Sequence, residues 1–149
     1  LKKYKKNKKS TIKNLSKILK NKNLSDVDFA SNIQNTMRNY LEVRFDFPFT
    51  KTVSSEIKGK YLFAVESASE QKVCAIECIQ KIFCQTDIIR YGQKSFGINK
   101  TSFLEKEKET LVEQLIQSIE TLEVVEVVEV FEIENDNKEN NIKEGENNA

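Results

Sequence analysis

Three cysteines are the side chains best suited to metal or redox chemistry, because the chain of 149 residues contains no histidine. Histidine is the commonest general base and metal ligand, so catalysis by a serine–histidine or cysteine–histidine pair is excluded within this chain. Cys74 and Cys78 stand one helical turn apart, whereas Cys84 does not fall on the same helix face. Because a structural zinc site needs four ligands, we interpret the cysteines as structural thiols, with a metal or redox site as the alternative.

Two other segments contain residues that occur in ligand-binding loops. KGK at residues 58–60 lacks the upstream glycine and the following serine or threonine of a phosphate loop. ENDNKENN at residues 134–141 is rich in oxygen ligands but lacks the glycine turn and final glutamate of a calcium loop. No carboxylate pair stands out as an acid–base couple. The sequence therefore predicts a protein that is not an enzyme and uses no cofactor, and the odd cysteine count favours a reducing compartment.

Charge is distributed unevenly along the chain, although the formal net charge is only +1. Residues 1–22 contain ten lysines and no acidic residue, whereas residues 120–149 contain ten acidic residues and two lysines. This asymmetry predicts terminal segments with partners of their own. The alternative interpretation is that the many lysine, asparagine, isoleucine and glutamate residues reflect an AT-rich genome.

The lysine-rich head includes Tyr4 and has three open interpretations. A nucleic-acid-binding arm would neutralise phosphates and stack Tyr4 on a base. A membrane flank would follow a spanning helix on its cytoplasmic side, and the first residue, Leu1, agrees with a fragment that lacks that helix. The third interpretation is a solvated tail. We favour the membrane flank, and its candidate residues are Lys2, Lys3, Lys5, Lys6, Lys8 and Lys9.

Apolar residues recur at spacings of three and four and predict an all-α protein, a small bundle of about four to six helices. Among these residues, the stretch 61–65 is ambiguous between a helix turn and a short strand. The predicted helices cover roughly residues 10–21, 26–44, 52–59, 67–86 and 102–122. The predicted core consists of Phe29, Ile33, Met37, Tyr40, Leu41, Ile76, Ile79, Phe83, Leu111, Leu115 and Ile119.

Capping and turn residues set the bounds of these helices. Ser25, Ser67 and Ser102 each stand three residues before an acidic residue, which is the pattern of a capping box. Pro48 disfavours helix at the residue before it, and we expect the phenylalanines around it to fill the core from a loop. The glycines within residues 87–97 predict a turn after the fourth helix.

The C-terminal part of the chain is acidic. Glutamate occurs at every third residue from Glu120 to Glu132, which fits neither one helix face nor one strand face, so this segment either extends the last helix or pairs as a strand. The acidic segment 120–134 could bind a basic partner surface or fold back on the lysine head. We divide the chain into a basic juxtamembrane arm (1–9), a helical domain (10–122) and an acidic, largely disordered tail (123–149).

Two stretches carry spaced motifs, MRNYLEVRFDFPFTKTVSSEI at residues 37–57 and IQKIFCQTDIIRYG at residues 79–92. Together they resemble the cytoplasmic helical region of Bat-type (BatD-like) bacterial membrane proteins, the products of aerotolerance operons. Thr86 stands where the family often has cysteine, and the tail has no counterpart. The matching residues are Tyr40, Leu41, Arg44, Phe45, Thr52, Glu56, Ile57, Asp87, Arg90 and Tyr91.

The resemblance implies a non-enzymatic protein-interaction domain at the cytoplasmic face of the bacterial inner membrane. It also implies work with a MoxR-type AAA+ ATPase and von Willebrand A-domain proteins in assembly or stress tolerance. The alternative function is a soluble nucleic-acid-binding protein that uses the lysine arm. The candidate partner-contact residues are Asp87, Arg90, Tyr91 and Gly92, in which Asp87 and Arg90 form either a local ion pair at a helix end or part of a contact surface.

Overall fold

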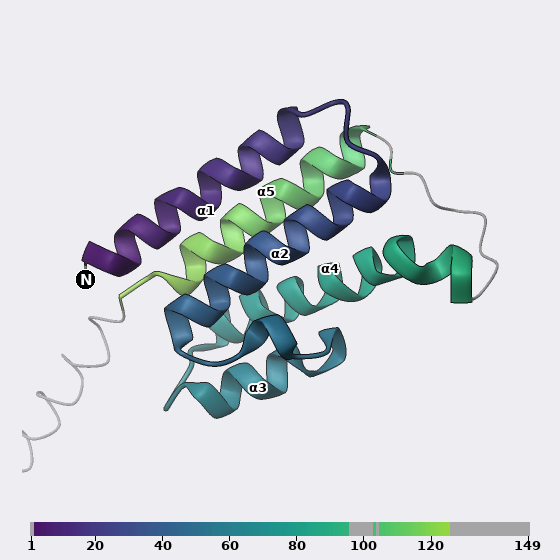
Figure 1. Cartoon of the computed structure of the whole chain (residues 1–149). Coiled ribbons are helices and arrows are strands. Elements are labelled where there is room, and N and C mark those ends of the chain that lie inside the picture. The colour runs from purple at the N-terminus through teal and green to yellow at the C-terminus, as the bar shows by residue number, and fades with distance from the viewer. Residues whose placement is uncertain (1, 96–102, 104, 126–149) are drawn as a thin grey trace, which may run out of the picture.

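Four long helices form an up-and-down bundle (Figure 1). The computed structural model describes residues 2–95, 103 and 105–125, without the side chains of residues 2, 3 and 93–95. Helix α1 packs on α2 and α5, and α4 also packs on α2 and α5, so each helix touches two neighbours. The prediction of an all-α bundle is confirmed. The long helices are α1 (Lys2–Lys20), α2 (Asp26–Phe45), α4 (Glu70–Ser95) and α5 (Glu105–Leu122).

The connection between α2 and α4 lies outside the bundle, beside α4. It contains two 3₁₀ helices, η1 (Phe49–Lys51) and η2 (Ser54–Glu56), followed by α3 (Ile57–Ala64). Phe49 is fully buried, as we expected for the phenylalanines of this loop. The ambiguous stretch at residues 61–65 is helical up to Ala64. Helix α3 does not stop at Gly59 as predicted, because Ile57 and Tyr61 on either side of that glycine both bury their side chains.

The core lies where the four long helices face one another. Ten of the eleven predicted core residues are buried, and Leu111 is half-buried against the edge of the same cluster. Periodicity identified these residues because an amphipathic helix buries positions three and four apart. The core also takes in Phe49 from the loop, as expected, and residues that we did not predict, which are Leu15, Ile57, Tyr61, Ala75, Ile82, Val112 and Leu122.

The first helix begins earlier than predicted, at Lys2 rather than near residue 10. Lysine is a good helix former, and the lysine-rich turns are held to the bundle through other residues. The Asn7 side chain donates to the Tyr40 carbonyl oxygen at 3.4 Å, and the Tyr4 ring lies against the Arg44 guanidinium. Residues 2–9 are therefore part of a packed helix and not a solvated arm.

The fourth helix also differs from its prediction at both ends. Its N-terminal cap is Ser69, whose hydroxyl accepts from the Lys72 amide at 3.3 Å, and not Ser67. It continues past Thr86 to Ser95, through the stretch predicted as a turn. Thr86 is fully buried, and glycine inside a helix costs only about 1 kcal/mol, so tertiary packing outweighs the turn propensity. The predicted cap at Ser25 is confirmed, whereas the one at Ser102 lies outside the described residues.

Helix α5 is fixed to α2 by a cluster that we call the Glu123 clasp, made of Tyr40, Arg44 and Glu123. The Tyr40 hydroxyl donates to Glu123 Oε1 at 2.7 Å, and Arg44 Nε lies 3.0 and 3.1 Å from the two carboxylate oxygens. Next to the clasp, Lys8 of α1 pairs with Glu120 of α5 at 2.7 Å. The end of α5 is thereby joined to both α1 and α2.

Candidate functional site

A polar cluster buried between α2, the 3₁₀ segment and α4 is the most connected group of side chains in the described part of the chain. We call it the Arg38 network. It brings together distant parts of the sequence, since its residues come from positions 34 to 90. Its members are Gln34, Arg38, Ser54, Thr86, Asp87 and Arg90.

Arg38 lies at the centre of the network and is only 9% exposed. Its Nη1 donates to the carbonyl oxygens of Phe49 (2.8 Å) and Thr52, and its Nη2 donates to Ser54 Oγ at 3.0 Å. Its Nε donates to Gln34 Oε1 at 3.1 Å. Burial lowers the pKa of Arg38, and the nearby Asp87 carboxylate opposes this shift. The guanidinium stays charged in proteins, so these acceptors must remain in place to compensate its burial.

Gln34 and Asp87 connect the arginine to α4. Gln34 Nε2 donates to Thr86 Oγ1 at 2.8 Å and to Asp87 Oδ1 at 2.6 Å. Ser54 Oγ accepts from Arg38 and donates to Asp87 Oδ2 at 2.5 Å, so Asp87 receives bonds on both oxygens. The Ser54 hydroxyl is buried and already bonded on both sides, which makes it a junction between elements.

Arg90 brings the network to the surface. Its Nε donates to Ser31 Oγ and its Nη1 to Gln34 Oε1, both at 3.1 Å, so two hydrogen bonds hold the guanidinium against α2. The Tyr91 ring lies 4.9 Å from that guanidinium and is 51% exposed. Across a shallow hollow of about 280 Å³, Val53 is 58% exposed. We call the group of exposed Val53, exposed Tyr91 and half-buried Arg90 the Tyr91 surface.

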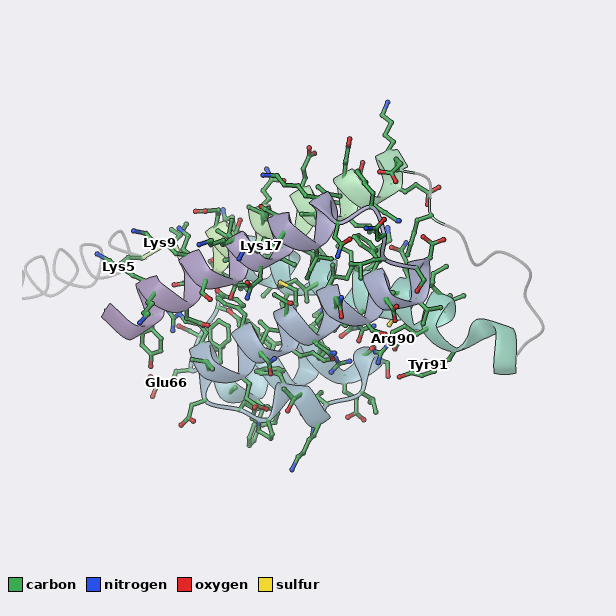
Figure 2. The ribbon with its side chains drawn as sticks, turned by 45° about the horizontal axis from the view of Figure 1, so that its top comes forward. Lys5, Lys9, Lys17, Glu66, Arg90 and Tyr91 are labelled. Atoms are coloured by element: carbon green, nitrogen blue, oxygen red, sulfur yellow. The ribbon has the colours of Figure 1, made fainter. Side chains whose placement is uncertain are left out.

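The four predicted contact residues lie on one helical stretch, not in a turn. Asp87 and Arg90 approach each other to 3.7 Å, as the ion-pair alternative predicted, although their shorter bonds go to other residues. Tyr91 is exposed, whereas Gly92 is buried beside Ile88. Among the four, Tyr91 therefore offers the largest side chain to a partner (Figure 2).

Sequence reasoning missed Gln34, Arg38 and Ser54. An arginine in a helix is usually exposed, and no sequence pattern connects it to carbonyl groups eleven and fourteen residues away. One signal was present in the sequence. Gln34 and Arg38 stand four residues apart, and Gln34 directly follows the buried Ile33, so both flank the apolar face of α2.

The six lysines predicted as a membrane flank all belong to helix α1. Lys5, Lys6 and Lys9 are exposed, whereas Lys8 is half-buried in its pair with Glu120. The side chains of Lys2 and Lys3 lie outside the described ones. Tyr4, the predicted base-stacking group of the nucleic-acid interpretation, holds its ring 4.6 Å from the Arg44 guanidinium.

The cysteines lie on α4. Cys74 is exposed, whereas Cys78 and Cys84 are half-buried. Burial and then the Asp87 charge raise the pKa of Cys84, which favours its unreactive thiol form. Within the described residues, no group of three or more cysteine and carboxylate side chains is placed to hold a metal ion. Among the described helices, none combines the length and apolar composition needed to cross a bilayer.

Comparisons of this chain with family models, with curated proteins and with solved structures find no match. The Bat-type resemblance therefore remains a hypothesis that rests on the matching residues.

Proposed function

We propose that this chain is a non-enzymatic protein-interaction domain whose recognition site is the Tyr91 surface. The proposal rests on the observation that hydrogen bonds beneath this surface hold the Arg90 side chain in place. Tyr91 is half-exposed, and the guanidinium beside its ring is fixed to α2 by two hydrogen bonds. Tyrosine and arginine are enriched among the residues that dominate binding energy at interfaces. A side chain that is already held in place loses less conformational entropy on binding.

The Arg38 network gives the surface its rigidity. Its hydrogen bonds connect α2, the 3₁₀ segment and α4, so Val53 and Tyr91 lie on elements that are joined to each other beneath the surface. The hollow between them is lined by both apolar and polar side chains, which suits a protein partner with a small protruding group.

The Bat-type resemblance supplies the candidate partners. We propose a MoxR-type AAA+ ATPase and von Willebrand A-domain proteins, with the domain held at the cytoplasmic face of the inner membrane of a bacterium. The matching residues Asp87, Arg90 and Tyr91 support this proposal, because they belong to the same network and surface.

The test uses purified ATPase and A-domain proteins from the cells that encode this chain. We expect Tyr91→Ala to weaken binding at least tenfold, as for a residue that dominates an interface. Phe63→Ala is the matched control, because Phe63 is an exposed aromatic residue (80%) on α3. Equal binding by the two variants would exclude the Tyr91 surface as the site. Absence of binding by the unmodified chain to any of these proteins would reject the partners.

A further inference from the structure

We propose that the exposed face of α1 binds the anionic surface of a lipid bilayer and lies along it lengthwise. This inference concerns a different side of the molecule from the Tyr91 surface and does not depend on the proposed function. It extends the membrane-flank hypothesis from a short arm to a whole folded helix. The face is defined by six exposed lysines, which are Lys5, Lys6, Lys9, Lys13, Lys17 and Lys20.

The helix gathers these lysines on one side. At about 100° of rotation per residue, the six fall within an arc of about 120°. The opposite side of α1 carries Leu15, which is fully buried, and Thr11, which is 5% exposed. From Lys5 to Lys20 the face extends about 22 Å at a rise of about 1.5 Å per residue. A straight row of charges of this length can meet a flat surface all at once.

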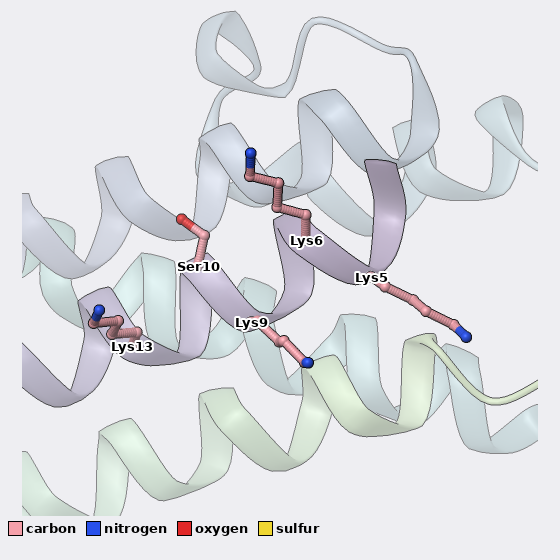
Figure 3. Close-up of a pocket in the computed structure, with 5 residues that line it drawn as sticks. All are labelled: Lys5, Lys6, Lys9, Ser10 and Lys13. Carbon is pink, nitrogen blue, oxygen red and sulfur yellow. The ribbon is translucent and has the colours of Figure 1, made fainter. Parts of the chain in front are cut away.

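The charge of this face is not neutralised within the described part of the molecule. No ion pair joins any of the six lysines to a described carboxylate, and the paired lysine of α1, Lys8, lies outside the arc. The side chains around Lys9 and Ser10 spread away from one another over a shallow hollow (Figure 3). Residues 1–22 hold ten of the 24 basic residues and none of the 23 acidic ones, so the rest of the chain is acidic. An anionic partner is therefore attracted to α1 and repelled by the remainder.

We favour lipid over nucleic acid as the partner, because the α1 face lacks the types of side chain that read or stack on bases. It has no arginine or aromatic residue among its lysines, and Tyr4 points to Arg44 instead. Base stacking and bidentate base contacts need such groups, whereas clustered lysines near an anionic leaflet each contribute about 1 kcal/mol without any defined geometry. Figure 2 shows Lys5, Lys9 and Lys17 along α1, whereas Arg90 and Tyr91 lie apart from them, on the C-terminal half of α4. A domain lying on its α1 face therefore leaves the Tyr91 surface accessible.

The experiment measures sedimentation of the full chain with vesicles. One set contains phosphatidylcholine and phosphatidylserine in a three-to-one ratio, and the other contains phosphatidylcholine alone. We expect binding only to the first set, with loss of binding as salt is raised. The triple variant Lys9→Gln, Lys13→Gln, Lys17→Gln should lower the partition coefficient about 100-fold, at about 1 kcal/mol for each lysine. Glutamine keeps helix propensity, and circular dichroism verifies that α1 remains folded.

Two further triple variants test whether the effect depends on the position and on the charge of the α1 lysines. Lys60→Gln, Lys81→Gln, Lys106→Gln removes the same charge from exposed positions outside α1 and should bind as the unmodified chain does. Lys9→Arg, Lys13→Arg, Lys17→Arg keeps the charge and should retain binding.

Three results would overturn the proposal. One is equal binding to both vesicle sets, and another is an equal loss in the two glutamine triples, which would reflect overall charge only. The third is tighter binding to a short DNA duplex than to anionic vesicles, abolished by the α1 glutamine triple, which would make nucleic acid the partner.

Discussion

Two arginines on the same helix are held in opposite ways. Arg38 is 9% exposed, and its hydrogen bonds go to backbone carbonyl oxygens, an amide and a hydroxyl, with the Asp87 carboxylate connected to it through that amide and that hydroxyl. The Arg44 side chain is 27% exposed and pairs directly with Glu123. Arg38 thus holds a loop and a helix in one arrangement at the expense of desolvation, whereas Arg44 makes a pair that water can partly replace. The comparison shows that the contribution of an arginine to the stability of the fold depends on how many buried acceptors would lose a donor without it, and not on its charge alone.

The largest expected effect is at Arg38. Arg38→Ala removes a donor from the Thr52 carbonyl oxygen and from the Ser54 hydroxyl. It leaves Gln34 Oε1 and the Phe49 carbonyl oxygen with one donor each. It also empties the buried space that the guanidinium fills, so we expect the free energy of unfolding to fall by about 3–5 kcal/mol. Urea denaturation followed by circular dichroism measures this change. A small domain has a total of only about 5–15 kcal/mol, so partial unfolding in buffer would agree with the prediction.

Arg38→Lys is the variant that shows whether geometry or charge matters. Lysine keeps the charge but cannot donate in several fixed directions, so it should recover only part of the loss. A loss below about 1 kcal/mol for Arg38→Ala would show that the network is not essential to the fold and would remove the contrast with Arg44.

Alkaline pH tests the Glu123 clasp next. Burial, followed by the hydrogen bond to Glu123, raises the pKa of Tyr40 above its ordinary value of 10.0. The folded chain then keeps the phenol proton where the unfolded chain loses it, so stability is full below pH 10 and falls as pH rises above it. The expected slope is about 1.4 kcal/mol per pH unit from this one proton. Tyr40→Phe should lose less stability than the unmodified chain between neutral and strongly alkaline pH, as thermal unfolding at each pH would reveal. An identical alkaline loss in both chains would contradict the assignment.

The smallest expected effect is at Glu123. Glu123→Gln removes the charge but keeps an acceptor for Tyr40, so we expect a loss of about 1 kcal/mol that shrinks as salt is added. Lys22→Gln serves as the comparison, because the Lys22–Glu105 pair is exposed on both sides and its loss should not change the midpoint of urea denaturation. A salt-independent loss as large as that of Arg38→Ala would mean that the clasp behaves as a buried pair.

The sequence predicted the helices whose stability comes from a periodic apolar face. Helix α2 and helix α5 have nearly the bounds that their patterns indicated, and their faces supplied most of the predicted core. The prediction failed where contacts between elements decide the local structure. Thr86 continues α4 because its hydroxyl is bonded in the core, and the lysine-rich turns of α1 are fixed through Asn7 and Tyr4.

The candidate site was predicted in part. The spacing of Asp87 and Arg90 indicated their ion pair, because residues three apart on a helix are neighbours. The central role of Arg38 could not be predicted, since it depends on how a loop eleven to sixteen residues further along folds over α2. A spacing pattern in the sequence describes one helix at a time. The Arg38 network is made of hydrogen bonds between different elements, so no such pattern indicates it.

The antiparallel contact of α1 and α5 has a mechanical consequence. Lys8 near the start of α1 meets Glu120 near the end of α5, so the two helix ends emerge from the same end of the bundle. Tension applied between these ends would open the helix pair one turn at a time and would not slide the helices along each other. Because only a few contacts break at each step, the force needed is small. The Lys8–Glu120 pair and the Glu123 clasp lie at the point where such peeling begins, so they set the force at which the bundle starts to yield.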